Sequence, residues 1–154
     1  MRVTTYYDHL KAENALKFKG KLLEEVLQFL TDPKIRFGIT HPSDIKDIIG
    51  EKFEYNGWAD KVPVAKSKLT INYMKSKCGV CFQLGNVART YADILKLMQL
   101  HYIKAIEVGI IIVPLKIESK KLGANYAQYE RLEKEIKLYN DIIAVPIFLI
   151  GISN

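Results

Sequence analysis

Residues 70–114 read TINYMKSKCGVCFQLGNVARTYADILKLMQLHYIKAIEVGIIIVP, and this stretch decides the fold. Residues 69–74 and 78–84 both alternate between large apolar side chains and polar or small ones, which is the period of a β-strand. The Lys-Ser-Lys sequence at 75–77 lies between them and predicts a turn. Together these features predict an antiparallel hairpin.

The two faces of the predicted hairpin differ in character. Val80 and Phe82 project to one face, where they should enter an apolar core. Cys81 and Gln83 share the other face, and Asn72 of the first strand is expected to join them. We therefore expect one polar depression lined by Asn72, Cys81 and Gln83.

A helix and a central strand should follow the hairpin. Residues 88–104 have the spacing of an amphipathic helix, with an expected buried stripe of Tyr91, Ile94, Leu95, Met98 and Tyr102. Residues 106–114 are almost entirely apolar, as in a strand that is buried on both faces. This order of elements predicts an α/β domain with a mixed central sheet flanked by helices.

The chain before the hairpin predicts mainly helices. A short strand at residues 3–7 leads into a helical pattern over residues 11–31, and Gly20 should interrupt that pattern. A second helix is expected to begin with Ser43 as its N-cap and to close at Gly50.

Three further elements are predicted outside these regions. Residues 35–39 are expected to form a short strand, and residues 128–139 a helix. Residues 142–150 should form the last strand. Because Pro146 has no backbone N–H to donate, that strand is expected at an edge of the sheet or with a bulge.

Length and charge set broad limits on function. The chain has 154 residues, which suits one domain spanning residues 1–154. A formal net charge of +6 favours a polyanionic partner, although a lysine-rich surface also serves solubility.

We expect no membrane association, because no signal peptide is recognisable and the apolar runs are too short to cross a bilayer. Two cysteines without a secretory signal indicate a reducing, cytoplasmic compartment.

A run of lysines around the hairpin has two open interpretations. It can be a solvated sheet edge, where lysines block edge-to-edge aggregation, or a rim that faces DNA phosphates. The lysines concerned are Lys61, Lys66, Lys68, Lys75 and Lys77.

The chain resembles the BglII-type branch of the type II restriction endonucleases, which have the PD-(D/E)XK nuclease fold. The resemblance rests on residues 72–83, on QLGNVARTYADILKLMQLHY, on GIIIVP and on the closing VPIFLIGI. It implies a restriction-endonuclease-like fold and Mg²⁺-dependent hydrolysis of double-stranded DNA by a homodimer. In such a site two carboxylates hold Mg²⁺ through oxygen atoms, and the ion polarises the phosphate and activates a water molecule.

The catalytic pattern of this branch is only partly present. Gln83 matches the branch's glutamine, but the preceding glutamate position is occupied by Cys81 and the strand acid position by Asn72. A further polar residue of the branch would correspond to Asn56 or Glu54.

The missing carboxylates predict a weakened or lost active site with very low Mg²⁺ affinity. Asn72 carries no charge, and the sulfur of Cys81 is a soft ligand that does not suit Mg²⁺. The alternative is an active Mg²⁺-dependent endonuclease that uses other ligands, such as Glu54 and Asp60. The double change Asn72→Asp and Cys81→Glu is expected to raise the Mg²⁺ affinity.

Cys78 and Cys81 also have the C-x-x-C spacing of thiol-redox proteins, which is a third alternative. In an extended strand, however, residues three apart point to opposite faces. Neither cysteine opens a predicted helix, where the pKa of a thiol would fall. The pattern favours two small buried cysteines over a redox pair or a zinc site.

Overall fold

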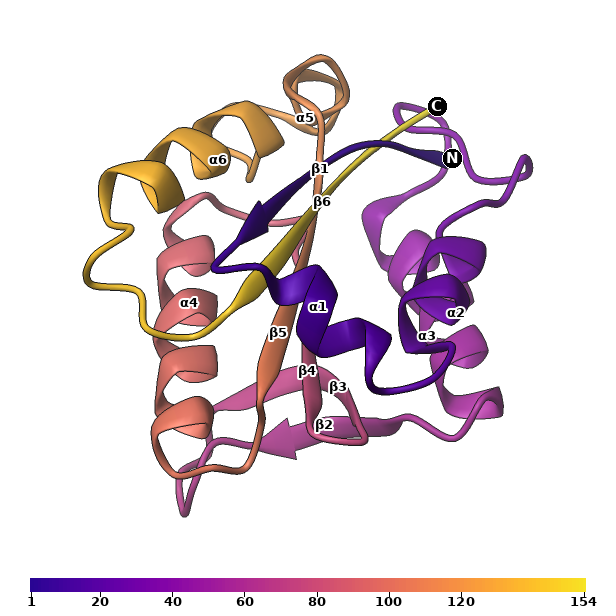
Figure 1. Cartoon of the computed structure of the whole chain (residues 1–154). Coiled ribbons are helices and arrows are strands. Elements are labelled where there is room, and N and C mark those ends of the chain that lie inside the picture. The colour runs from indigo at the N-terminus through magenta and orange to yellow at the C-terminus, as the bar shows by residue number, and fades with distance from the viewer.

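The computed structural model describes residues 1–154 and contains a six-stranded mixed sheet with helices on both faces (Figure 1). The parallel strands β4, β5 and β6 form its centre, and antiparallel strands complete it on both sides. The predicted α/β class with a mixed sheet is confirmed. The spatial order is β1-β6-β5-β4-β3-β2, with β1 at Arg2–His9, β2 at Ala59–Pro63, β3 at Thr70–Lys75, β4 at Cys78–Phe82, β5 at Val108–Pro114 and β6 at Ile147–Ser153.

The helices divide the core into two clusters, one on each face of the sheet. One face is covered by α1 (Ala12–Lys17), α2 (Leu22–Phe29) and α3 (Pro42–Tyr55), which share a cluster of 24 buried residues with the sheet. The other face is covered by α4 (Ala88–Tyr102) and α6 (Tyr129–Leu138), with a cluster of 17 buried residues. A short helix, α5 (Lys116–Leu122), follows β5 at the end of the sheet (Figure 1).

The hairpin of β3 and β4 forms as predicted. Lys75 lies opposite Cys78, so only Ser76 and Lys77 make the turn, with φ angles of 47° and 60°. Positive φ at both positions is the mark of a type I′ turn, whose twist matches that of the flanking strands. Val80 and Phe82 are buried in the cluster under α1, α2 and α3, as expected.

Helix α3 is longer than predicted because Gly50 lies inside it. The helix runs from Pro42 to Tyr55, and the side chain of His41, rather than that of Ser43, caps its N-terminus. A Cβ atom on Gly50 would lie 3.1 Å from the hydroxyl oxygen of Tyr73. Glycine therefore favours the close approach of a β3 side chain here and does not end the helix.

Two predicted strand assignments are wrong. Residues 35–39 contain no strand, and 37–39 form a turn, although Ile35 and Phe37 are buried. The last strand begins only at Ile147, and it is an internal strand between β1 and β5. Pro146 precedes it and contributes only its carbonyl oxygen, which accepts a hydrogen bond from the backbone N–H of Gly109, so its missing donor costs nothing.

Helix α4 is rotated from the predicted orientation. Its buried residues include Asp93 and Leu97, whereas Tyr91, Leu95 and Tyr102 of the predicted buried stripe are exposed. The cause lies in the sheet, where a Cβ atom on Gly109 would come within 2.8 Å of the Leu97 side chain and one on Gly79 within 3.1 Å. These two glycines open the space into which Leu97 packs. No helix in the structure is long and apolar enough to cross a membrane.

Candidate functional site

The β3–β4 hairpin brings Asn72 to the second strand, but not in the manner of a metal ligand. The ladder between the strands ends at the pair Tyr73–Val80. Beyond it, Asn72 Oδ1 accepts a hydrogen bond from the backbone N–H of Phe82 at 2.9 Å. The side-chain oxygen of Asn72 thus accepts a hydrogen bond from a backbone N–H group of the sheet. It is therefore already used and is not a free metal ligand.

Cys81 does not line an open depression, contrary to the expectation from the sequence. Its side chain is 0% exposed and belongs to the apolar cluster under α4, together with Ile94 and Leu97. Burial raises the pKa of the Cys81 thiol well above its ordinary value, and the nearby carboxylate of Asp93 raises it further. Cys81 is therefore a neutral core side chain.

Gln83 shares the α4 side of the sheet with Cys81, as predicted, and both ends of its amide are used. Its Nε2 donates to Asp93 Oδ2 at 3.0 Å, and its Oε1 accepts from the backbone N–H of Gly85 at 2.9 Å. Asp93 is only 4% exposed, and its other oxygen pairs with Lys96 Nζ at 3.0 Å. Gln83, Asp93 and Lys96 form a closed polar cluster beside Cys81.

Asp93 is the residue of this site that reasoning from the sequence missed. The signal was a carboxylate and an ammonium group three positions apart on one helix, Asp93 and Lys96, next to apolar positions. More cations stand nearby. Burial lowers the pKa of Lys46 on α3, and the positive charge of Arg89 lowers it further while Asp93 opposes the shift.

The other predicted site residues lie elsewhere. Asn56 is the exposed C-cap of α3 and donates its side-chain amide to the carbonyl of Lys52 at 2.8 Å. Glu54 and Asp60 lie near the phenol of Tyr73, whose pKa is raised to about 12 by burial first and then by these carboxylates. No hydrogen bond or ion pair connects Asn56, Glu54 or Asp60 to the Gln83 cluster.

These donors do not fit Mg²⁺, which prefers several hard oxygen ligands. Asn72 Oδ1 and Gln83 Oε1 accept backbone N–H groups, and Cys81 is a buried neutral thiol. The structure contains no group of three or more His, Cys, Asp or Glu side chains arranged to hold an ion. The one carboxylate of the cluster, Asp93, is already paired with an ammonium group.

The five predicted DNA-binding lysines differ in their partners. Three of them are in ion pairs: Lys61 with Asp60, Lys75 with Glu25, and Lys77 with Glu107. Lys75 also lies over the ring of Trp58, with Nζ 5.9 Å from its centroid. The remaining two, Lys66 and Lys68, are exposed and have no ion-pair partner.

The two cysteines cannot act as a redox pair because they lie in different core clusters. Cys78 packs under α1, α2 and α3, and Cys81 packs under α4. Burial raises the pKa of Cys78 to about 12. Both thiols are free.

We expect neither cysteine to react with a disulfide reagent at pH 8 in the folded protein. The reactive species is the thiolate, and a raised pKa keeps its population negligible at that pH, while burial blocks access. Labelling followed by mass spectrometry should find both thiols unmodified until denaturant is added. Rapid labelling of Cys78 or Cys81 under native conditions would contradict the assignment of both to the core.

A mixed sheet with a β-hairpin leading into its parallel centre, helices on both faces and a polar cluster at the end of β4 defines a restriction-endonuclease-like fold. The sequence model of the restriction endonuclease BglII/BglIII family matches residues 4–152, and the chain belongs to that family.

Two solved structures support the same fold. The crystal structure of restriction endonuclease BglII complexed with a DNA 16-mer matches with a TM-score of 0.82 and 17% identity, covering 100% of this chain and 77% of that chain. Free BglII matches with a TM-score of 0.77 and 19% identity, covering 100% of this chain and 80% of that chain. No curated protein sequence matches the chain.

Proposed function

We propose that the chain is a DNA-binding protein, formed by one restriction-endonuclease-like domain over residues 1–154, in which metal-dependent cleavage is weakened or lost. The observation that carries this proposal is the use of the motif positions. The nuclease hairpin is intact, but Asn72 has become part of the sheet and Cys81 part of the core. The matching restriction endonuclease BglII was solved in complex with a DNA 16-mer, and the positive net charge of +6 of this chain suits such a partner.

A second candidate function is favoured by Asp93. This buried carboxylate lies beside Cys81 and Gln83, the motif positions at which the family resemblance implies a metal site. An active endonuclease would have to bind Mg²⁺ through Asp93 and release Lys96 from it. Mg²⁺ would then be the cofactor, supplying Lewis-acid activation of the phosphate.

DNA binding is expected to be sequence-tolerant and strongly dependent on salt. Each phosphate contact should contribute about −0.9 to the slope of log K against log salt concentration. Fluorescence anisotropy with a mixed-sequence duplex measures this slope.

The two unpaired lysines of the predicted rim are tested by the double variant Lys66→Gln with Lys68→Gln. This variant should reduce the slope by about 2 if both lysines contact phosphates. Affinity that stays millimolar at low salt, or that ignores salt, would exclude the nucleic-acid function.

The chain is also expected to form a homodimer in the cytoplasm, where both thiols stay reduced. The exposed stripe of Tyr91, Leu95 and Tyr102 on α4 supports this assembly, because a second copy can bury it. Analytical ultracentrifugation should give the dimer for the unaltered protein and the monomer for Leu95→Lys. Phe18→Lys serves as the control, because Phe18 is also exposed but lies outside α4. A monomeric unaltered protein, with and without DNA, would contradict the prediction.

A further inference from the structure

A cavity of about 840 Å³ lies between the two ends of the chain and residues 31–39. Its floor is apolar and includes Ile35 and Phe37. Arg2, Arg36 and Lys121 line it together with Asn154. The volume is within the range of small-molecule and recognition sites in proteins.

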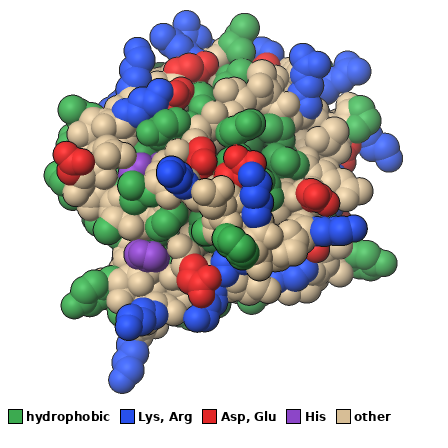
Figure 2. Space-filling view, in the orientation of Figure 1, with side chains coloured by type: hydrophobic (Ala, Val, Ile, Leu, Met, Phe, Trp, Pro, Cys, Tyr) green, Lys and Arg blue, Asp and Glu red, His purple; other side chains and the backbone are tan.

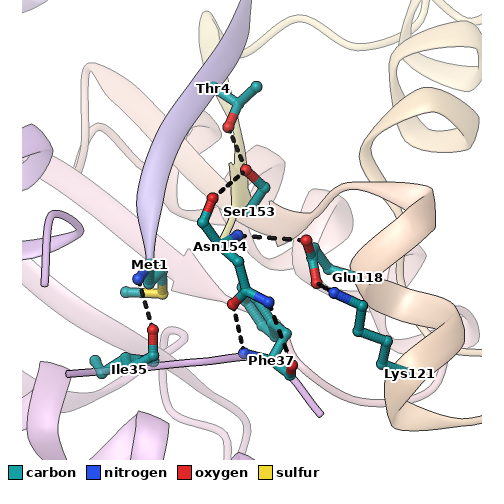
Figure 3. Close-up of polar contacts among 8 residues, drawn as sticks. All are labelled: Met1, Thr4, Ile35, Phe37, Glu118, Lys121, Ser153 and Asn154. Atoms are coloured by element: carbon teal, nitrogen blue, oxygen red, sulfur yellow. Dashed lines mark hydrogen bonds and ion pairs between the residues drawn. The ribbon is translucent and has the colours of Figure 1, made fainter. Parts of the chain in front are cut away.

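Hydrogen bonds from both ends of the chain hold the wall of this cavity in place (Figure 3). The amino group of Met1 donates to the carbonyl of Ile35 at 2.6 Å. The side chain of Asn154 accepts from the N–H of Phe37 at 2.6 Å and donates to its carbonyl at 3.3 Å. Residues 31–39 contain no helix or strand, and these contacts tie them to both ends of the chain.

All the charged side chains that line the cavity are positive. No Asp or Glu lines it, and neither Arg2 nor Arg36 has an ion-pair partner. Lys121 pairs with Glu118 at 2.7 Å, which leaves two free guanidinium groups. Burial lowers the pKa of the Met1 amino group; Asp32 opposes this, while Arg36 and Arg2 lower it further. Figure 2 shows Lys and Arg side chains gathered at the upper right, over the chain ends of Figure 1.

The positive cavity and Gln83 lie at the same end of the sheet but on opposite faces, because Ile35 and Phe37 belong to the cluster under α1, α2 and α3 whereas Gln83 contacts α4. The parallel strands β4 and β6 finish at that end of the sheet, and the antiparallel strand β1 begins there. Three strand spacings, about 14 Å at roughly 4.8 Å each, separate β1 from β4 within the sheet.

We propose that this cavity is a docking site for the phosphate backbone of duplex DNA, with Arg2 and Arg36 as the phosphate contacts. The inference rests on the proposed DNA-binding function and adds a surface that lies outside the lysines around the hairpin. Guanidinium groups suit the role because each presents a planar fork of donors that matches two phosphate oxygens. Neither side chain makes a hydrogen bond or ion pair within the protein, so both are free to bind a ligand.

The test compares two double variants of equal charge change by fluorescence anisotropy with a mixed-sequence duplex. Arg2→Gln with Arg36→Gln should reduce the slope of log K against log salt concentration by about 2, because two phosphate contacts are lost. Lys21→Gln with Lys134→Gln is the matched control and should leave the slope unchanged, since both lysines are exposed and neither lines the cavity. Lys121 is left unaltered because its removal would leave the buried carboxylate of Glu118 unpaired.

A third variant separates charge from shape. Arg2→Lys with Arg36→Lys should keep the slope of the unaltered protein, because both positive charges remain. If the unaltered protein binds DNA and the glutamine variant keeps its full slope, the docking site is wrong while the proposed function stands. If the unaltered protein does not bind DNA at all, the proposed function fails, and the docking site with it. Saturable binding of a mononucleotide that depends on Arg36 would show that the cavity takes a small ligand and not duplex DNA. That result would overturn the proposed docking site.

Discussion

Supercoiled plasmid DNA incubated with the unaltered protein and Mg²⁺ is expected to remain uncut. Metal-dependent cleavage needs an ion that polarises the phosphate and lowers the pKa of a bound water. Here Asn72 and Gln83 direct their oxygens to backbone N–H groups, and the Cys81 thiol is buried and neutral. Enzymes accelerate their reactions by factors of about 10⁶ or more, so loss of the ion should bring cleavage down to background.

Gel analysis of nicked and linear products gives the cleavage rate, and EDTA provides the metal-free control. A second control is the variant Asp93→Asn, which removes the one carboxylate beside Gln83. Robust cleavage by the unaltered protein would contradict the prediction. If that cleavage also requires Mg²⁺ and disappears in Asp93→Asn, the metal-binding carboxylate is supplied by α4 and not by the hairpin.

Cys81→Glu is expected to destabilise the fold by about 4 kcal/mol or more. The new side chain would be larger than the thiol, and its carboxylate would be buried without a partner. Asp93 lies close enough to raise the pKa of Cys81, so it would also repel a second negative charge. Burial therefore works against the simple restoration of a metal site by Asn72→Asp and Cys81→Glu.

Urea unfolding followed by the fluorescence of Trp58, the only tryptophan, measures this loss. Two single changes serve as controls. Cys81→Ala should cost about 1 kcal/mol, because it removes one buried atom. Asn72→Asp should be nearly neutral, because a carboxylate oxygen can still accept the N–H of Phe82. A Cys81→Glu variant as stable as the alanine control would show that the core opens at this position.

Local patterns predict the centre of this fold well. The hairpin and β5 follow from alternation and from an unbroken apolar run, and both are confirmed. The orientation of α4 could not be predicted in the same way, because the helix carries apolar side chains on two faces. Gly79 and Gly109, on two different strands, decide which face packs, and only their pairing across the sheet reveals the space for Leu97.

The candidate site shows the same limit. Motif positions predict that Asn72 and Cys81 cannot supply the charge of two carboxylates, and that conclusion needs no coordinates. The engagement of Gln83 by Asp93 depends on how far α4 is rotated, so it is visible only in three dimensions. The same holds for the cavity at the chain ends, where residues from opposite ends of the sequence meet Phe37.

The placement of β6 between β1 and β5 also bears on how the chain folds. Thr4 and Ser153 hydrogen-bond to each other although they are 149 residues apart. On a ribosome the first strand emerges long before its partner exists, and closing so long a loop costs conformational entropy before any pairing compensates it. Proteins with many such distant contacts fold slowly. Until β6 is made, β1 and β5 each present an open edge that is able to pair with other chains.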